Sequence, residues 1–199
     1  MDVPARRLVL ASASPARLRL LRDAGLDPVV VVSGVDESGV HAGPPADLVQ
    51  ELARRKVQAV AQDQPDSLVV GCDSLLELDG QALGKPVDPA DAVARWHRMR
   101  GRSATLLTGH AVVDTRTGRT AGGTAATLVR FGCPSDEEVT AYVATGEPLH
   151  VAGAFTLDGR SAPFVDGIDG DPGNVIGLSL PLLRRLLAEL GTGVHELWT

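Results

Sequence analysis

Short apolar runs alternate with segments of helical periodicity along the first half of the chain. Residues 8–11, 29–32 and 68–70 are continuous and rich in leucine and valine, which is typical of strands buried on both faces. Residues 15–24 and 47–62 instead repeat apolar side chains at helical spacing between polar ones. We therefore expect buried strands and amphipathic helices, in the alternation typical of an open α/β sheet.

The second half of the chain predicts longer strands. Residues 104–113 and 120–131 indicate two antiparallel strands that form a second lobe, and Gly122 and Gly123 favour a bulge or a close approach. The other elements expected are a helix beginning near Pro89, a helix capped by Ser135 and Glu138, a strand and turn at residues 153–164, a turn-rich loop at residues 166–174 and a helix at residues 181–190.

The composition is that of an ordinary globular protein. With 199 residues, of which 44% are hydrophobic, the chain suits one domain, residues 1–199, with two lobes. The net charge of -6 gives no electrostatic footprint for duplex nucleic acid, and no apolar stretch approaches the ~18 residues of a membrane span. Since the N-terminus also lacks the apolar core of a signal peptide, we expect a cytoplasmic protein without a disulfide framework.

A carboxylate and an ammonium group come together after the third apolar run. Asp73 follows residues 68–70 where that strand is expected to end, and ligand sites of open α/β sheets gather at the carboxyl ends of strands. The Asp79-Gly80 pair predicts a hairpin turn that folds Lys85 back toward Asp73. Two interpretations stay open, namely a phosphate and metal site, or a buried strand end with a solvated lysine.

The first expected helix begins in a way that suits an anion. Ser14 is a good N-cap and Pro15 suits the first helical position, directly after a strand. The free N–H groups and positive dipole end of such a helix attract an anion, toward which Ser12, Ser14 and Arg17 offer donors. Because Arg17 opposes the dipole unless an anion lies beside it, we favour an anion site over an ordinary capped helix.

Two further charged positions carry alternative interpretations. Asp36 and Glu37 follow the second apolar run, where paired carboxylates suit a hard divalent cation, although taken alone the pair favours a polar loop. Of the 19 basic residues only Lys56 and Lys85 are lysines, and Lys56 falls in the apolar half of the helix at residues 47–62. Its ammonium is expected either to extend past the helix to water or to bind a phosphate.

Three blocks, in chain order, carry a resemblance to a known family. The first block is residues 10–17. The second consists of Gly71-Cys72-Asp73-Ser74 together with Leu83-Gly84-Lys85-Pro86. The third consists of residues 142–148 together with residues 174–178. Together they resemble the Maf family of nucleotide pyrophosphatases over nearly the whole chain. The resemblance implies an α/β fold with a mixed, twisted sheet, flanking helices, and two lobes around a deep nucleotide-binding groove.

The resemblance also implies an activity. It implies hydrolysis of nucleoside triphosphates, modified nucleotides among them, to the monophosphate and pyrophosphate, with Mg²⁺ or Mn²⁺ as cofactor. It further implies a homodimer and a link to septum formation. The resemblance implies that Asp73 is the acid–base carboxylate. The alternative from the residues themselves is that Asp73 holds the metal, with Glu37 as the second ligand. The residues expected at the substrate are Ser12, Ser14, Arg17, Glu37, Lys56 and Lys85.

Base preference is expected to differ from that of the subgroups the family contains. Ala16 stands where the subgroups carry a basic or aromatic side chain. Ser74 stands where they carry threonine or glutamine, and Asp158 stands where they carry glutamine or glutamate. We therefore expect a broader or shifted preference. Two other classes stay open: a non-catalytic nucleotide-binding regulator of cell division, which does not require Asp73, and a phosphatase that releases orthophosphate.

Overall fold

The structure is a computed structural model that describes residues 6–37, 40 and 43–199, so the expectation of no signal peptide rests partly on residues outside it. The strands are β1 (Arg7–Leu10), β2 (Val29–Val30), β3 (Ser67–Leu78), β4 (Gln81–Leu83), β5 (Ser103–Asp114), β6 (Thr120–Phe131) and β7 (Val165–Asp169). The helices are α1 (Pro15–Asp23), α2 (Pro45–Ala61), α3 (Pro89–Met99), α4 (Asp136–Ala144), α5 (Pro172–Ile176) and α6 (Leu180–Glu189). Short 3₁₀ helices lie at Glu147–His150, Ala152–Ala154, Ala162–Phe164 and Val194–Leu197.

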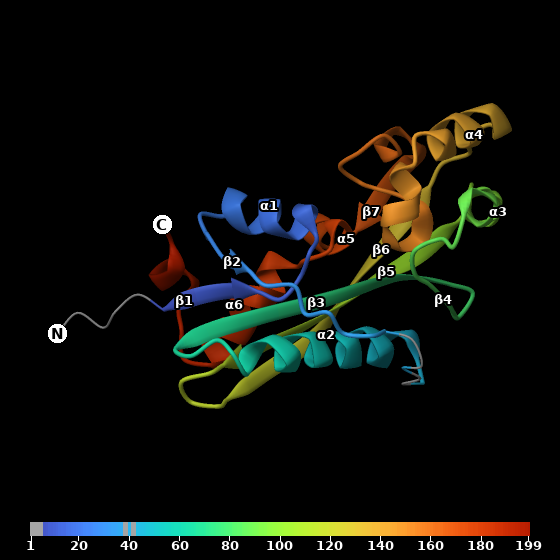
Figure 1. Cartoon of the computed structure of the whole chain (residues 1–199). Helices are drawn as coiled ribbons and strands as arrows, with labels where there is room; N and C mark the ends of the chain where they lie inside the picture. Colours follow the sequence, from blue (N-terminus) through green and yellow to red (C-terminus); the bar gives the residue numbers. More distant parts are fainter. Residues whose placement is uncertain (1–5, 38–39, 41–42) are drawn as a thin grey trace. The chain divides into compact units, whose positions relative to one another are not determined.

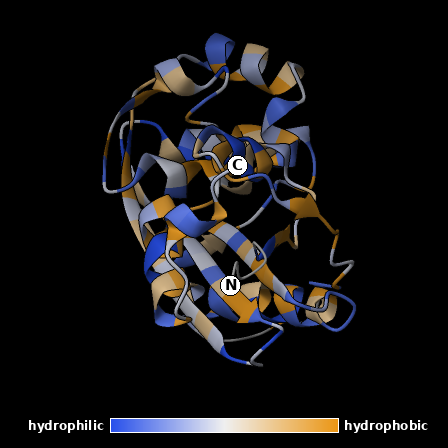
Figure 2. Cartoon of the chain, turned by 90° about the vertical axis from the view of Figure 1, so that its left-hand side faces the viewer, coloured by the Kyte–Doolittle hydropathy of each residue, from blue (hydrophilic) through white to orange (hydrophobic). Residues whose placement is uncertain are grey.

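The strands form a mixed sheet with flanking helices, which confirms the predicted α/β class (Figure 1). The strand order is β2-β1-β3-β5-β6-β7, and β4 pairs with β3. Strand β1 is parallel to β2 and β3, whereas β4 and β7 are antiparallel to β3 and β6. The helices carry both hydrophobic and hydrophilic residues, as helices with one buried face do (Figure 2).

The chain divides into two compact units. Unit 1 comprises Met1–Asp73, Thr108–Ala125 and Gly177–Thr199, and unit 2 comprises Ser74–Leu107 and Ala126–Ile176. Strands β3, β5 and β6 therefore each contribute residues to both units. The prediction that the two long strands form a second lobe was wrong, because one half of each strand packs in the core of unit 1 and the other half in the core of unit 2.

In unit 1, strands β1 and β3 are buried on both faces, as predicted. Successive side chains of a strand point to opposite faces, so each strand serves two cores. One core joins the sheet to α1 and α6 and includes Leu8, Leu10, Leu68, Val70, Cys72, Leu21 and Leu183. The other joins the sheet to α2 and includes Val9, Ala11, Val69, Ala53, Val57 and Val60. Figure 1 shows α1 and α2 on opposite sides of these strands.

Helix α2 lies unusually close to the sheet because glycines lie beneath it. A Cβ atom on Gly71 would lie 2.7 Å from Val57 Cγ1, and one on Gly109 would lie 2.2 Å from the Val49 carbonyl oxygen. A Cβ atom on Gly122 would lie 2.5 Å from Gln50 Nε2, which confirms the predicted close approach at that position. These glycines fix where α2 lies over the strands of unit 1.

Unit 2 is built around Trp96 of α3. The indole ring makes edge-to-face contacts with Phe131, Tyr142 and Phe164, at centroid distances of 5.8, 5.8 and 5.6 Å. Its Nε1 donates to the Ala154 carbonyl oxygen at 2.9 Å. The predicted capping box of α4 is confirmed, with Ser135 and Glu138 bonding reciprocally.

Two predictions about strands were wrong. Strand β3 does not end at Asp73 but continues to Leu78, because Leu76 and Leu78 are buried in the core of unit 2. The second apolar run forms only the two-residue strand β2, whose Val29 and Val30 are 39% and 40% exposed. Strand β2 is the edge of the sheet and has β1 as its neighbour, so its valines are not covered on both sides.

Two further predictions were wrong between residues 153 and 176. Residues 153–164 contain the predicted turn but no strand, and 3₁₀ helices lie at their two ends. Gly153 has a φ of 71°, and its N–H bonds the Gly84 carbonyl oxygen at 3.0 Å, which a strand beginning there does not allow. The expected loop at residues 166–174 contains β7, which pairs with β6, and most of α5. The glycines and aspartates there had suggested turns, whereas pairing with β6 imposes a strand.

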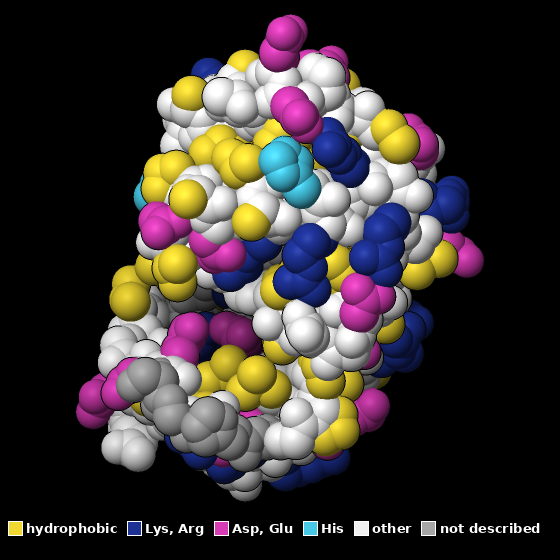
Figure 3. Space-filling model, turned by 90° about the vertical axis from the view of Figure 1, so that its right-hand side faces the viewer, with side chains coloured by type: hydrophobic (Ala, Val, Ile, Leu, Met, Phe, Trp, Pro, Cys, Tyr) yellow, Lys and Arg dark blue, Asp and Glu magenta, His cyan; other side chains and the backbone are white. Residues whose placement is uncertain are grey.

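One face of the protein is mixed in charge. On the face drawn in Figure 3, acidic and basic side chains are interspersed. Among the helices of the described residues, none is both long enough and apolar enough to cross a membrane.

Candidate active site

The side chain of Lys56 lies between two carboxylates in unit 1. Its Nζ is 2.5 Å from Asp73 Oδ1 and 2.7 Å from Glu37 Oε1. The Lys56 and Asp73 side chains are 11% and 13% exposed, whereas Glu37 is 53% exposed. The ammonium thus contacts acidic side chains, which neither interpretation of the sequence had considered.

The local backbone explains how Lys56 reaches Asp73. Asp73 lies four residues after Val69 on β3, and therefore on the same face of the strand, toward α2. Gly71 lies between them and has no side chain to hold α2 away. A Cβ atom there would lie 3.4 Å from Lys56 Cβ. Lys56 consequently passes over Gly71, and its ammonium ends at Asp73.

Burial dominates the electrostatics of Asp73. Burial raises the pKa of Asp73 above its ordinary value, against the lowering effect of Lys56 and Arg17. Glu37 adds to the increase because two carboxylates repel each other. The neighbouring Cys72 is fully buried, and burial raises its pKa to about 11, so its thiol is protonated at neutral pH and is no nucleophile.

The start of α1 places Arg17 next to this cluster. Ser14 caps the helix as predicted, and its Oγ accepts from the Arg17 N–H at 3.4 Å. Ser12 Oγ accepts from Arg17 Nη1 at 3.1 Å and from the Ser14 N–H at 3.2 Å. Arg17 Nε donates to the Gly177 carbonyl oxygen at 2.7 Å. The guanidinium is therefore held in place at the helix N-terminus and acts electrostatically on Asp73.

Three predicted residues belong to unit 2. The hairpin that precedes Lys85 is confirmed, with Leu76 opposite Leu83. Lys85 is exposed, and the segment before it is fixed because Arg95 Nη1 donates to the Gly84 carbonyl oxygen at 2.6 Å. Ser74 follows Asp73 directly on β3, and Asp158 is exposed in a loop. Ala16 lies in unit 1, partly exposed in the first turn of α1.

Sequence reasoning missed two contributors to this arrangement. Gly71 was part of a recognised block but had no assigned role, although a glycine inside a strand is a known signal of close approach. Gly177 supplies a carbonyl oxygen to Arg17 and has a φ of 125°, a conformation that favours glycine. A backbone acceptor of this kind has no side-chain signature in the sequence.

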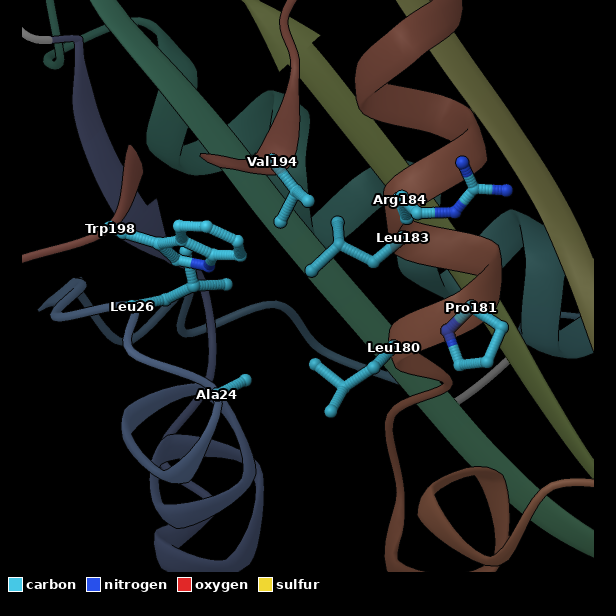
Figure 4. Close-up of a pocket in the computed structure, with 8 residues that line it drawn as sticks. All are labelled: Ala24, Leu26, Leu180, Pro181, Leu183, Arg184, Val194 and Trp198. Atoms are coloured by element: carbon cyan, nitrogen blue, oxygen red, sulfur yellow. The ribbon is translucent and has the colours of Figure 1, made fainter. Parts of the chain in front are cut away.

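A pocket in unit 1 has a different character. It is lined by Ala24, Leu26, Leu180, Pro181, Leu183, Arg184, Val194 and Trp198. In Figure 4 the side chains of Leu180, Leu183 and Val194 extend toward the space between α1 and α6, whereas the guanidinium of Arg184 points away from it. An apolar lining of this kind does not suit a phosphate, so the candidate site is the Lys56 cluster.

These observations define an α/β protein in which a buried lysine, a partly buried arginine, a helix N-terminus and a carboxylate of raised pKa gather on one unit. Comparison with protein families then shows that the chain belongs to the Maf family, since the pattern described as Maf-like protein matches residues 7–190.

Relatives of high identity carry a common name. The nucleoside triphosphate pyrophosphatase of Streptomyces coelicolor is 68% identical over 198 residues, covering 98% of this chain and 96% of that protein. The protein of the same name from Streptomyces avermitilis is 64% identical over 200 residues, covering 100% and 97%. That from Salinispora tropica is 60% identical over 199 residues, covering 97% and 88%.

Proposed function

We propose that this protein is a nucleoside triphosphate pyrophosphatase that hydrolyses nucleoside triphosphates to the monophosphate and pyrophosphate. The observation that carries the proposal is the cluster of Lys56, Asp73 and Glu37 near Arg17, in a chain that is 68% identical to a protein of that name. Phosphoryl transfer depends mainly on positioning and on neutralising charge, which such a cluster supplies.

The cationic groups are proposed to bind the triphosphate. The N-terminus of α1, with the hydroxyls of Ser12 and Ser14, offers donors to phosphate oxygens. Arg17 and Lys56 add positive charge in unit 1, and the family resemblance assigns Lys85 of unit 2 to the same substrate. A triphosphate that draws Lys56 to itself leaves Asp73 and Glu37 without their ammonium partner.

Asp73 is the proposed catalytic carboxylate. A carboxylate whose pKa is raised by burial is a better proton acceptor than an ordinary one, which suits a group that takes the proton of an attacking water. When the water attacks the α-phosphorus, pyrophosphate leaves and the monophosphate remains. A non-catalytic regulator has no need of such a carboxylate, so loss of Asp73 separates the two functions.

A divalent cation, Mg²⁺ or Mn²⁺, is the proposed cofactor. In the part of the chain that the structure describes, no three histidine, cysteine or acidic side chains gather into a metal cluster. Asp73 and Glu37 nevertheless converge on one point, and two carboxylates completed by substrate phosphates and water are the oxygen donors that Mg²⁺ prefers. The cation would neutralise phosphate charge when bound.

Base preference and biological setting are also proposed. Ala16, Ser74 and Asp158 are the proposed specificity positions, and Asp158 offers a carboxylate acceptor to an exocyclic amine of a base. Modified nucleotides, a homodimer and a link to septum formation are proposed from the family resemblance, and a cytoplasmic location is proposed from the composition of the chain. Light scattering of the purified protein tests the dimer, which is contradicted by a mass near 20.7 kDa.

The test of the activity is a panel of nucleoside triphosphates with Mg²⁺ or Mn²⁺, scored for pyrophosphate and orthophosphate separately. We expect pyrophosphate and the monophosphate in equal amounts. Orthophosphate and the diphosphate as main products indicate a phosphatase instead. Nucleotide binding without hydrolysis of any member of the panel supports the non-catalytic regulator.

A further inference from the structure

A single carboxylate in unit 2 gathers three hydrogen bonds that the proposed mechanism does not use. Glu147 begins the 3₁₀ helix Glu147–His150, directly after α4. Its Oε1 accepts from Thr156 Oγ1 at 2.6 Å, from the Arg160 N–H at 3.0 Å and from Tyr142 Oη at 3.3 Å. Donors from α4 and from both ends of residues 156–161 therefore meet at one oxygen atom.

Residues 156–161 also close on themselves. Ser161 is fully buried, and its Oγ accepts from the Thr156 N–H at 2.8 Å and donates to the Thr156 carbonyl oxygen at 3.0 Å. A Cβ atom on Gly159 would lie 2.5 Å from both Glu147 Oε1 and Thr156 Oγ1, so the backbone passes directly against the carboxylate. Asp158 lies on the exposed part of this closed loop.

We infer that Glu147 is a positioning residue that holds the loop of Asp158 for selection of the nucleotide base. The inference rests on the proposed function and on the proposed role of Asp158. Discrimination between bases requires an acceptor that is fixed before the base arrives, because a mobile acceptor must be ordered on binding and adapts to the wrong base. Three hydrogen bonds to one carboxylate supply that order.

A carboxylate acceptor such as Asp158 distinguishes bases that carry an exocyclic amine from bases that do not. Cytosine presents a 4-amino donor where uracil presents a carbonyl oxygen, so a fixed carboxylate favours the cytidine nucleotide. Cytidine and uridine triphosphates otherwise offer the same sugar and phosphates. The ratio of kcat/KM for these two substrates therefore reports the base contact alone.

The test compares this ratio in the wild type and in Glu147→Ala, Glu147→Gln, Asp158→Ala and the double variant Glu147→Ala/Asp158→Ala. We expect Glu147→Ala to reduce the cytidine-to-uridine ratio by about tenfold, within the range of one base-reading contact. Glu147→Gln retains most of the ratio, because its amide oxygen still accepts from Thr156 and Arg160. In the Asp158→Ala background, Glu147→Ala changes the ratio no further, because the acceptor is already absent.

Glu138→Ala is the matched control. It removes the capping box of α4, where the Ser135 N–H donates to Glu138 Oε2 at 2.7 Å, and leaves the bonds of Glu147 in place. It lowers the melting temperature without changing the ratio. Hydrogen exchange at the Thr156 and Arg160 amides provides a direct readout of the loop, and it accelerates in Glu147→Ala only.

Each outcome bears on the inference. Faster exchange in Glu147→Ala with an unchanged ratio shows that the bonds are only structural and overturns it. Additive effects of Glu147→Ala and Asp158→Ala on the ratio, or a wild-type ratio of one, overturn it as well and leave the proposed activity standing. A wild type that hydrolyses no nucleoside triphosphate overturns the proposed function itself, and the inference with it.

Discussion

Asp73, which is partly buried, and Asp114, which is buried, are two aspartates of unit 1 with different partners. Asp114 is 1% exposed at the end of β5, and it accepts from Arg6, from Thr117 Oγ1 at 2.8 Å and from the Arg116 N–H at 3.0 Å. Asp73 is 13% exposed in the middle of β3, and it shares the ammonium of Lys56 with Glu37. Asp114 thus has three donors of its own, whereas Asp73 shares the ammonium of Lys56 with a second carboxylate.

Their pKa values move in opposite directions. Burial raises the pKa of both groups, but at Asp114 the hydrogen bonds from Thr117, Arg6 and Arg116 outweigh burial and lower the pKa. At Asp73 burial outweighs Lys56 and Arg17, and the pKa is raised. Ionised Asp114 therefore stabilises the fold, whereas ionised Asp73 lowers its stability above the ordinary aspartate pKa. A carboxylate whose ionisation lowers the stability of the fold is a candidate for a catalytic role.

The largest expected effect is that of Asp73→Asn on turnover. The substitution keeps the size of the side chain and removes its charge and basicity. We expect kcat for the best nucleotide to fall by about 10²-fold or more, the scale of losing an acid–base group. Initial rates of pyrophosphate release measure it, and turnover within a few-fold of wild type removes Asp73 from the mechanism.

Lys56→Met tests the cation that Asp73 shares. We expect kcat/KM to fall by about tenfold or more, the scale of one charge-assisted contact. Because Lys56 lowers the pKa of Asp73, its removal moves the acidic limb of the pH–rate profile to higher pH. Arg55→Met, on the same helix but paired with Glu51 at the surface, is the control and leaves the profile in place. An unmoved acidic limb in Lys56→Met contradicts the assignment of that limb to Asp73.

Asp114→Asn tests the contribution of the second aspartate to the stability of the fold. Asparagine retains one acceptor oxygen but loses the charge that Arg6 and Thr117 bond. We expect the free energy of unfolding to fall by about 2 kcal/mol, the scale of disrupting a buried charged hydrogen-bond network. Urea unfolding measures this loss. If the free energy of unfolding does not fall, the cost of burying the Asp114 charge equals the stabilisation from its hydrogen bonds.

The smallest expected effect is the pH dependence of the stability lost in Asp114→Asn. The folded pKa of Asp114 is lowered, so its contribution to stability is present above the unfolded value of about 3.9 and disappears as the pH falls through the folded value. The stability gap between wild type and Asp114→Asn is therefore wide at neutral pH and narrows in acid. Urea unfolding at several pH values measures the gap, and a gap that widens in acid contradicts the assignment.

Local signals in the sequence predicted much of this arrangement. The cap at Ser14, the capping box at Ser135 and the hairpin before Lys85 each depend on residues within a few positions of one another. The position of Lys56 in an apolar helix face also marked it as unusual. Its acidic partners were not predicted, because the pairing depends on the close approach of α2 at Gly71, which is a tertiary contact.

Where the predictions failed, distant contacts decided the structure. Nothing local to Asp73 shows that β3 continues into a second core, and pairing with β6 makes β7 from residues rich in glycine and aspartate. The carbonyl oxygen that Gly177 offers to Arg17 belongs to the backbone and has no residue pattern.

The most direct test is to measure kcat/KM and the melting temperature of Asp73→Asn and Asp114→Asn together, in one buffer at neutral pH. Asp73→Asn is expected to lose activity and to melt no lower than wild type, because it removes an ionised group that burial disfavours. Asp114→Asn is expected to melt roughly 4 to 8 °C lower, for about 2 kcal/mol in a chain of this size, and to keep its kcat/KM while folded. An active Asp73→Asn that melts early, or a folded Asp114→Asn without activity, contradicts the account.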